Sequence, residues 1–186
     1  MSDYTEQWNT LGFFIIRKAV PRALVEMVEA EVIATIRSDP PEAHPGSRGY
    51  NIGANFLVQP ETQPSPSAIN PEDKVAKIFN CHSEGQALQL ARHPVIVKHV
   101  AQLLGPHVDC FQSQFIFKNP GVIGQPWHQD SHYFQFTTPV QVGVWVALSR
   151  ATLDNGCLWV VPASHRFGLH THEPDTRPGA NNGYLE

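Results

Sequence analysis

The hydrophobic pattern changes its period at about residue 106, and this change limits the chain to folds in which helices precede strands. Within "VPRALVEMVEAEVIATIRSD", apolar residues recur at helical spacing; they are Leu24, Val25, Val28, Val32, Ile33 and Ile36. Within "SEGQALQLARHPVIVKHVAQLLG", the pattern predicts two helical pieces, with Ser83 as a cap, Pro94 starting the second piece and Gly105 ending it.

Beyond residue 106 the period becomes two, which is typical of strands with one buried face. In "HVDCFQSQFIFKN", one face carries Phe111, Ser113, Phe115 and Phe117, and the other carries Gln112, Gln114, Ile116 and Lys118. "PVQVGVWVAL" alternates valines (Val140 to Val146) with Gln141, Gly143, Trp145 and Ala147. The turn signal Asp154-Asn155-Gly156 precedes another strand, "CLWVV". Helices followed by strands predict an α+β fold with antiparallel strands.

Three further segments carry weaker signals. Residues 12–16 ("GFFII") predict a short strand, and residues 74–80 predict a short apolar element. Residues 38–71 are rich in proline and predict either a long loop or a pair of strands hidden by the composition. We expect one domain over residues 1–186, with a helical part to about residue 106 and strands from about residue 107.

Composition excludes several classes of partner. The net charge of −4 without a basic block argues against nucleic acid. The longest apolar runs are too short to span a bilayer, and the polar, acidic N-terminus does not predict a signal peptide. Cys81, Cys110 and Cys157 are far apart and form no CxxC pair, so a cytoplasmic location is expected.

The stretch "QPWHQDSHYF" (residues 125–134) carries the chemistry. Residues i and i+2 of a strand point to the same face, so His128 and Asp130 can reach one point there. An imidazole and a carboxylate so placed make two-thirds of the 2-His-1-carboxylate triad that holds non-haem iron(II). H-x-D alone is a weak pattern, and a hydrogen-bonded loop pair is its ordinary alternative. We interpret His132 as a pocket-lining or surface histidine.

The surrounding segments are more specific. "WHQDSHYF", the alternating strand with its central tryptophan, and "NGCLWVVPASH" (155–165) together resemble the phytanoyl-CoA dioxygenase family, in which glycine is usual at the position of Ala163. The resemblance includes "GFFII" and "QSQFIFK" and extends over essentially the whole chain. It implies a jelly-roll core, also called a double-stranded β-helix and similar to cupins, behind N-terminal helices. It also implies a dioxygenase that uses Fe(II), 2-oxoglutarate and O2 to hydroxylate a small organic substrate.

The resemblance assigns roles to individual residues. It implies that His128 and Asp130 are two of the three iron ligands. Four residues match positions that bind or line the 2-oxoglutarate site in the family; they are Lys77, Gln112, Gln114 and Trp145, with Lys74 as the alternative to Lys77. A lysine suits this task because its compact positive charge attracts a carboxylate. The identity of the substrate and the oligomeric state stay open.

The sequence departs from the family pattern after Asp130. A distal histidine ligand, an arginine that binds 2-oxoglutarate and the closing strands of the jelly roll are expected to be absent, as in a fragment of a longer protein. Alternatively, His170 or His172 of the "HTH" pair substitutes for the third ligand. The remaining alternatives are a catalytically silent relative that serves as a binding or interaction protein, and a cupin-like domain for another divalent metal.

Overall fold

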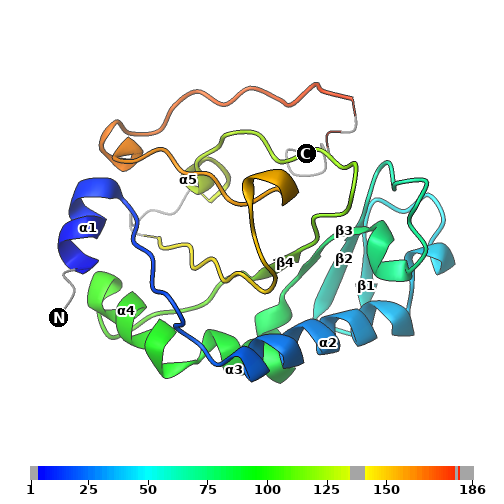
Figure 1. The fold of residues 1–186 in the computed structure, drawn as a ribbon, viewed down its shortest axis with the longest axis horizontal. Coiled ribbons are helices and arrows are strands. Elements are labelled where there is room, and N and C mark those ends of the chain that lie inside the picture. Colours follow the sequence, from blue (N-terminus) through cyan, green and yellow to red (C-terminus); the bar gives the residue numbers. More distant parts are fainter. Residues whose placement is uncertain (1–3, 135–140, 179, 181–186) are drawn as a thin grey trace.

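The structure is a computed structural model that describes residues 4–134, 141–178 and 180 (Figure 1). Its four strands form one antiparallel sheet, in which the order along the chain is also the order in space. The strands are β1 (Tyr50–Ile52), β2 (Phe56–Pro60), β3 (Val75–Phe79) and β4 (Gln114–Ile116). The proline-rich segment 38–71 therefore contains a pair of strands, which was one of its two expected forms.

Helices come mainly from the first half of the chain. They are α1 (Tyr4–Leu11), α2 (Arg22–Ser38), α3 (Gly85–Ala91), α4 (Pro94–Leu104) and the short α5 (Asp130–Tyr133), with 3-10 turns between them. The predicted helices are confirmed in α2, α3 and α4. Pro94 begins α4 and Gly105 follows its end with a positive φ of 95°, whereas Ser83 lies in a 3-10 turn just before α3.

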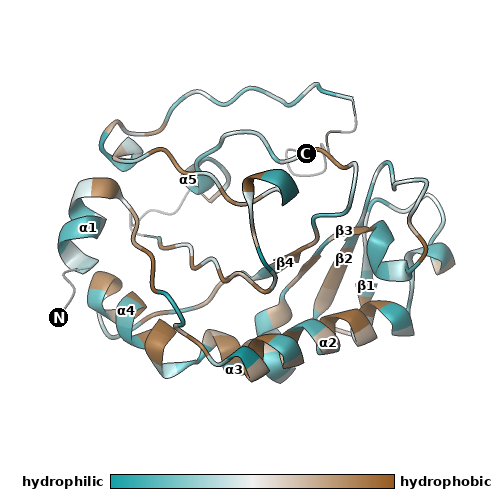
Figure 2. Ribbon diagram, in the orientation of Figure 1, coloured by the Kyte–Doolittle hydropathy of each residue, from teal (hydrophilic) through white to brown (hydrophobic). Residues whose placement is uncertain are grey.

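The hydrophobic core lies between α2 and one face of the sheet. Val28, Val32 and Ile36 of α2 pack with Val58 of β2 and Ile78 of β3. Burial of each such side chain contributes about 1.5–3 kcal/mol. In Figure 2 the apolar stripe of α2 faces the sheet, while α2 and α3 run along its lower side. The helical spacing read from the sequence thus identified the buried face of α2.

The opposite face of the sheet holds polar side chains. Lys77 of β3 is in register with Gln59 of β2 and Ile116 of β4, so these three residues share a face. Lys77 is only 8% exposed and Gln59 only 7%. β3 is buried along its whole length because strands flank it and both of its faces are covered. The two buried polar side chains of this face, Lys77 and Gln59, lie at the candidate site.

The α+β class with antiparallel strands is confirmed, but the placement of the strands differs from the prediction. Three of the four strands precede residue 106, in the part expected to be helical. These strands are short, so no long run of apolar residues marked them in the sequence. β3 is buried on both faces, so it also lacks the alternation of apolar and polar residues that marks a half-buried strand.

The predicted strands at residues 12–16, 141–148 and 157–161 are wrong for the part that the structure describes, since none of these residues is in a strand. Pro139 and Val140 lie outside the described residues. Of residues 107–119, only Gln114–Ile116 pair. Alternation reveals which side chains share a face, but a strand also needs a partner backbone. None of the described helices combines the length and apolar character that crossing a bilayer requires.

Candidate functional site

His128 and Asp130 do meet, although by a different local structure from the strand that we expected. Gln129 is extended (φ −115°, ψ 127°) and immediately precedes α5, whose first residue is Asp130. One extended residue between them turns both flanking side chains to the same side. His128 Nε2 consequently lies 3.3 Å from Asp130 Oδ1.

Hydrogen bonding defines the state of the His128 ring. Its Nδ1 lies 2.8 Å from the carbonyl oxygen of Pro126, and a carbonyl can only accept, so Nδ1 carries a hydrogen. Nε2 then faces the Asp130 carboxylate. The negative carboxylate favours a proton or another cation at Nε2. The hydrogen bond between the two side chains raises the pKa of His128 and lowers the pKa of the Asp130 carboxyl. A metal cation satisfies the same arrangement, because metal-bound histidines usually donate their other ring N–H to an oxygen.

Lys77 extends the site into the sheet. Its ammonium donates to Oε1 of Gln125 at 3.2 Å. Burial, helped by the nearby Lys118, lowers the pKa of Lys77 to about 8, while Asp130 and Glu61 act in the opposite direction. The expected alternative, Lys74, instead forms an ion pair with Glu42. Burial beside Asp130 therefore favours Lys77 over Lys74 as the charge that serves this site.

Gln125 connects the two parts of the site, and sequence reasoning missed it. While its Oε1 accepts from Lys77, its amide nitrogen lies 3.4 Å from Nε2 of His128, which is long for a hydrogen bond. A single carboxamide thus lies between the lysine and the histidine. A carboxylate has nearly the same shape as a carboxamide, so the space between Lys77 and His128 suits a carboxylate ligand. The position of Gln125 just before "PWHQD" was the available signal.

The other predicted pocket residues lie in different environments. Gln114 pairs with Phe79 and shares the face of Lys77, but it is exposed, whereas Gln112 precedes β4 and is half-buried. The proposed contacts of Gln112 and Gln114 with the co-substrate stay predictions. Trp145 is 52% exposed. Gly143, two residues before Trp145, lies close to Asp130, because a β-carbon at Gly143 would be 3.8 Å from Oδ2 of Asp130.

Two further polar residues lie near Lys77 and were not predicted. Gln59 is buried opposite Lys77 on β2, and Glu61 follows that strand. Burial raises the pKa of the Glu61 carboxyl, against a lowering hydrogen bond from Asn119. Their signal in the sequence was faint because both lie in the proline-rich segment 38–71.

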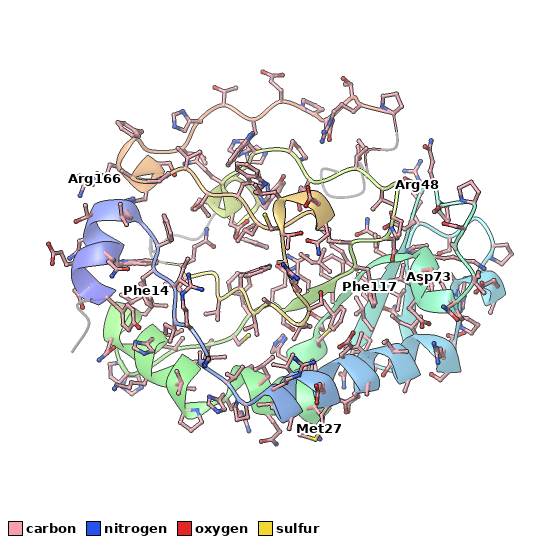
Figure 3. The ribbon with its side chains drawn as sticks, in the orientation of Figure 1. Phe14, Met27, Arg48, Asp73, Phe117 and Arg166 are labelled. Atoms are coloured by element: carbon pink, nitrogen blue, oxygen red, sulfur yellow. The ribbon has the colours of Figure 1, made fainter. Side chains whose placement is uncertain are left out.

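In the described part of the chain, no third metal ligand joins the pair. Within residues 4–134, 141–178 and 180, no group of three or more His, Cys, Asp or Glu side chains could hold a metal ion. His165 lies 3.3 Å from the carbonyl oxygen of Asn9, and Arg166 donates to the same oxygen at 2.7 Å. Figure 3 shows Arg166 beside α1. Its neighbour His165, from the "NGCLWVVPASH" segment, therefore contacts the end of α1 and does not join the pair. His172 lies against the backbone of Gln129.

The two side chains of the His128–Asp130 pair nevertheless have the chemistry of iron(II) ligands. An imidazole nitrogen and a carboxylate oxygen are ligands of the facial triad, and they lie 3.3 Å apart in the protein. The ring nitrogen that faces the carboxylate is the one not bonded to the backbone. His128 and Asp130 are thus two side chains of the kinds that the triad uses, and Lys77 places a positive charge nearby.

Comparisons with known proteins agree with the resemblance. The family model described as phytanoyl-CoA dioxygenase (PhyH) matches residues 8–183. The peroxisomal phytanoyl-CoA dioxygenase of Homo sapiens is 27% identical over 177 residues, which are 91% of this chain and 49% of that protein. The phytanoyl-CoA dioxygenase domain-containing protein 1 of Bos taurus is 34% identical over 135 residues, which are 70% of this chain and 43% of that protein. The chain thus spans about half the length, or less, of these curated relatives. No solved structure is significantly similar to it.

Proposed function

The chain belongs to the phytanoyl-CoA dioxygenase (PhyH) family, and we propose from this premise that it carries the site of an Fe(II)- and 2-oxoglutarate-dependent dioxygenase. The observation that carries the proposal is the continuous contact path from Lys77 through Gln125 to His128 and Asp130. The sheet and the extended segments after residue 141 belong, on this proposal, to a jelly-roll core within a single domain.

In this proposal His128 and Asp130 hold the iron. Nε2 of His128 and an oxygen of Asp130 face one another, and the Pro126 carbonyl orients the ring through Nδ1. In the family the third ligand is a distal histidine, which the sequence predicts to be absent from this chain, so the proposal assigns two of the three ligands here. When bound, iron(II) with 2-oxoglutarate and O2 supplies the oxidation that hydroxylates a C–H bond of the substrate.

Lys77 attracts a carboxylate of 2-oxoglutarate. Its ammonium is buried, so a carboxylate beside it replaces solvation that the lysine has lost, and the interaction is little screened by salt. Binding of the carboxylate displaces the Gln125 amide from between Lys77 and His128. Gln112, Gln114 and Trp145 remain proposed contacts of the co-substrate.

The substrate is proposed only as a small organic molecule. An acyl-CoA, an amino-acid derivative and a small secondary metabolite all fit the chemistry, because the substrate is recognised by loops around the metal and not by the metal ligands. The name of the human relative includes "peroxisomal". For this chain the cytoplasmic location stays a prediction from its cysteine pattern.

One observation favours a second function, that of a catalytically silent binding protein. Many large apolar side chains after residue 141 are exposed, among them Trp145, Trp159, Val161, Phe167 and Leu169. Such a surface favours association with another protein. Tight binding of 2-oxoglutarate together with Fe(II) separates the two functions, because a silent relative has no need of either.

The test is an anaerobic titration of the chain with Fe(II) and 2-oxoglutarate, followed by visible absorption. A chelated complex gives a weak metal-to-ligand charge-transfer band. We expect a band given by the unaltered chain to be lost in His128→Ala and to persist in His107→Ala, which removes an exposed histidine outside the pair. A band that His128→Ala leaves unchanged contradicts the proposed pair. If the folded chain gives no band, its His128 and Asp130 do not hold Fe(II) with 2-oxoglutarate without a third ligand, and the proposed activity is overturned for this chain.

A further inference from the structure

Gln129, the residue between the two proposed ligands, is held from a distant part of the chain. Its side-chain Oε1 accepts the backbone N–H of His170 at 2.8 Å. Its side-chain Nε2 donates to the carbonyl oxygen of Gly168, also at 2.8 Å. These bonds join positions about forty residues apart. Gln129 is therefore anchored to the segment 168–172 at both ends of its amide.

The ring of His172 adds a third bond to the same residue. Its Nε2 lies 2.8 Å from the backbone N–H of Gln129, and its Nδ1 lies 2.8 Å from the carbonyl oxygen of His170. Because the N–H can only donate and the carbonyl can only accept, Nδ1 carries the hydrogen and the ring is neutral. The His132 ring stacks on it, with centroids 4.1 Å apart and planes 9° apart. Both nitrogens of His172 are thus engaged within the protein.

We propose that Gln129 and His172 are positioning residues for the metal pair, forming a clasp that holds His128 and Asp130 face to face. The clasp consists of the Gln129 amide, the Gln129 backbone N–H, the His172 ring and the backbone of residues 168–170. This inference rests on the proposed function, because it concerns the same pair. It also gives His172 a part other than the substitute ligand that the sequence left open.

The physical argument concerns the backbone of one residue. The directions of the His128 and Asp130 side chains depend on φ and ψ of Gln129, which are the soft dihedrals between them. The clasp fixes the backbone N–H of Gln129, which comes just before these dihedrals. It also fixes the side chain of Gln129, which is attached to the Cα between them. Without it, rotation at Gln129 separates the imidazole from the carboxylate. Outer contacts of this kind usually change metal affinity by about tenfold to a hundredfold when they are removed.

Glutamine has the chemical groups that the clasp requires. The amide accepts at His170 and donates at Gly168, whereas a glutamate has the same shape but places an oxygen against the Gly168 carbonyl. Gln129→Glu is thus a nearly isosteric variant that keeps the acceptor for the His170 N–H and turns the bond to the Gly168 carbonyl into a repulsive contact. His172→Ala removes the bond to the Gln129 N–H, and His172→Gln can restore an acceptor there.

The experiment measures the affinity of the whole chain for Co(II), a spectroscopic substitute for iron(II), by visible absorption. We expect Gln129→Glu and His172→Ala to weaken binding about tenfold to a hundredfold. Part of the loss should return in His172→Gln, and His107→Ala should bind as the unaltered chain does. Far-UV circular dichroism and the thermal midpoint identify variants that fail to fold. A second readout is hydrogen exchange, in which the amide protons of Gln129 and His170 are expected to be slow, and that of Gln129 is expected to become fast in His172→Ala, which removes its acceptor.

The outcomes separate this inference from the proposed function. If His128→Ala abolishes Co(II) binding while folded Gln129→Glu and His172→Ala bind normally, the clasp proposal is overturned and the metal pair survives. If the chain binds no Co(II), or binds it equally after His128→Ala, the proposed function fails. In that case hydrogen exchange alone tests the clasp. Fast exchange of the Gln129 and His170 amide protons in the unaltered chain overturns it. Slow exchange that is lost in His172→Ala supports it.

Discussion

The backbone N–H of Ala163 donates to the carbonyl oxygen of Leu11 at 2.8 Å, so the "PASH" segment is bound to the end of α1. Ala163 adopts a left-handed conformation there, with φ 62°. An L-residue with a β-carbon is strained in this region by about 1 kcal/mol, whereas glycine is not. The structure thus gives a physical reason for the glycine that is usual at this position in the family.

We therefore expect Ala163→Gly to stabilise the fold by about 1 kcal/mol, less the added freedom of glycine in the unfolded chain. The thermal midpoint should rise by less than the roughly 2–4 °C that a full 1 kcal/mol would give. Gly156→Ala is the mirror control, because Gly156 has φ 81° and an added β-carbon would make only an ordinary 3.5 Å contact with Lys118. It should lower the midpoint. A lower midpoint for Ala163→Gly would contradict the strain argument.

Gly85 at the start of α3 should tolerate alanine much less well. Its φ is 64°, and a β-carbon would lie 2.1 Å from the carboxylate of Glu31. That carboxylate accepts the backbone N–H of Gln86 at 2.6 Å. Gly85→Ala combines backbone strain with displacement of a charged hydrogen bond, so we expect a loss of about 2 kcal/mol or more. Urea unfolding measures it, and a loss no larger than that of Gly156→Ala would show that Glu31 moves away freely.

Lys77→Met should stabilise the apo-protein and abolish binding of the co-substrate. Burial lowers the pKa of Lys77 to about 8, so the folded state gives up a proton more readily than the unfolded state. The buried charge therefore costs stability below about pH 8, and the cost disappears as the pH rises toward about 10.5. At neutral pH we expect a gain on the order of 2 kcal/mol in denaturant unfolding. Lys74→Met, the matched control, loses only the exposed ion pair with Glu42 and should change stability little.

Gln125→Glu should compete with the co-substrate. The new carboxylate replaces the amide that accepts from Lys77 and forms an ion pair with the buried ammonium. 2-oxoglutarate must then displace a charged partner, so we expect its dissociation constant to rise by about tenfold or more. Gln125→Ala, which leaves the place open, should bind 2-oxoglutarate at least as tightly as the unaltered chain. Equal affinity in all three proteins, measured by calorimetry, would mean that the co-substrate carboxylate binds elsewhere.

The metal-free His128–Asp130 pair should stabilise the fold in a defined pH range. The raised pKa of His128 contributes stability that is complete below the unfolded value of about 6.5 and is lost as the pH rises through the folded pKa. The lowered pKa of Asp130 contributes stability that is complete above about 3.9 and is lost as the pH falls through its folded value. The contribution is therefore greatest between about pH 4 and 6.5.

Because the Asp130 side chain is 59% exposed, we expect the pair to contribute less than about 1 kcal/mol. Unfolding of the unaltered chain and of His128→Ala at about pH 5.5 and about pH 8.5 measures the difference. The two proteins should differ more at the lower pH. A difference that grows with pH would have the wrong sign for an imidazolium that pairs with Asp130.

The amino-acid sequence by itself determined α2, α3 and α4 and the residue types of the candidate site, whereas it predicted neither α1 nor α5. The apolar spacing of α2, with Pro94 and Gly105 at the ends of α4, acts within a few residues, and helical hydrogen bonds are equally local. The H-x-D pair is local too, since one extended residue suffices to bring His128 and Asp130 together. The order and spacing of the longer motifs placed the chain in its family.

Only the tertiary structure decided which segments pair as strands and which of the two lysines is buried beside the His128–Asp130 pair. A strand needs a partner from elsewhere in the chain, so the strong alternation at residues 141–148 did not make a strand there, whereas the plain segment Val75–Phe79 became a buried central strand. Lys74 and Lys77 have similar surroundings in sequence, but β3 buries only Lys77. The contacts of Gln125 with Lys77 and of Gln129 with His172 join positions more than forty residues apart. Such contacts depend on how the whole chain packs, which no local pattern encodes.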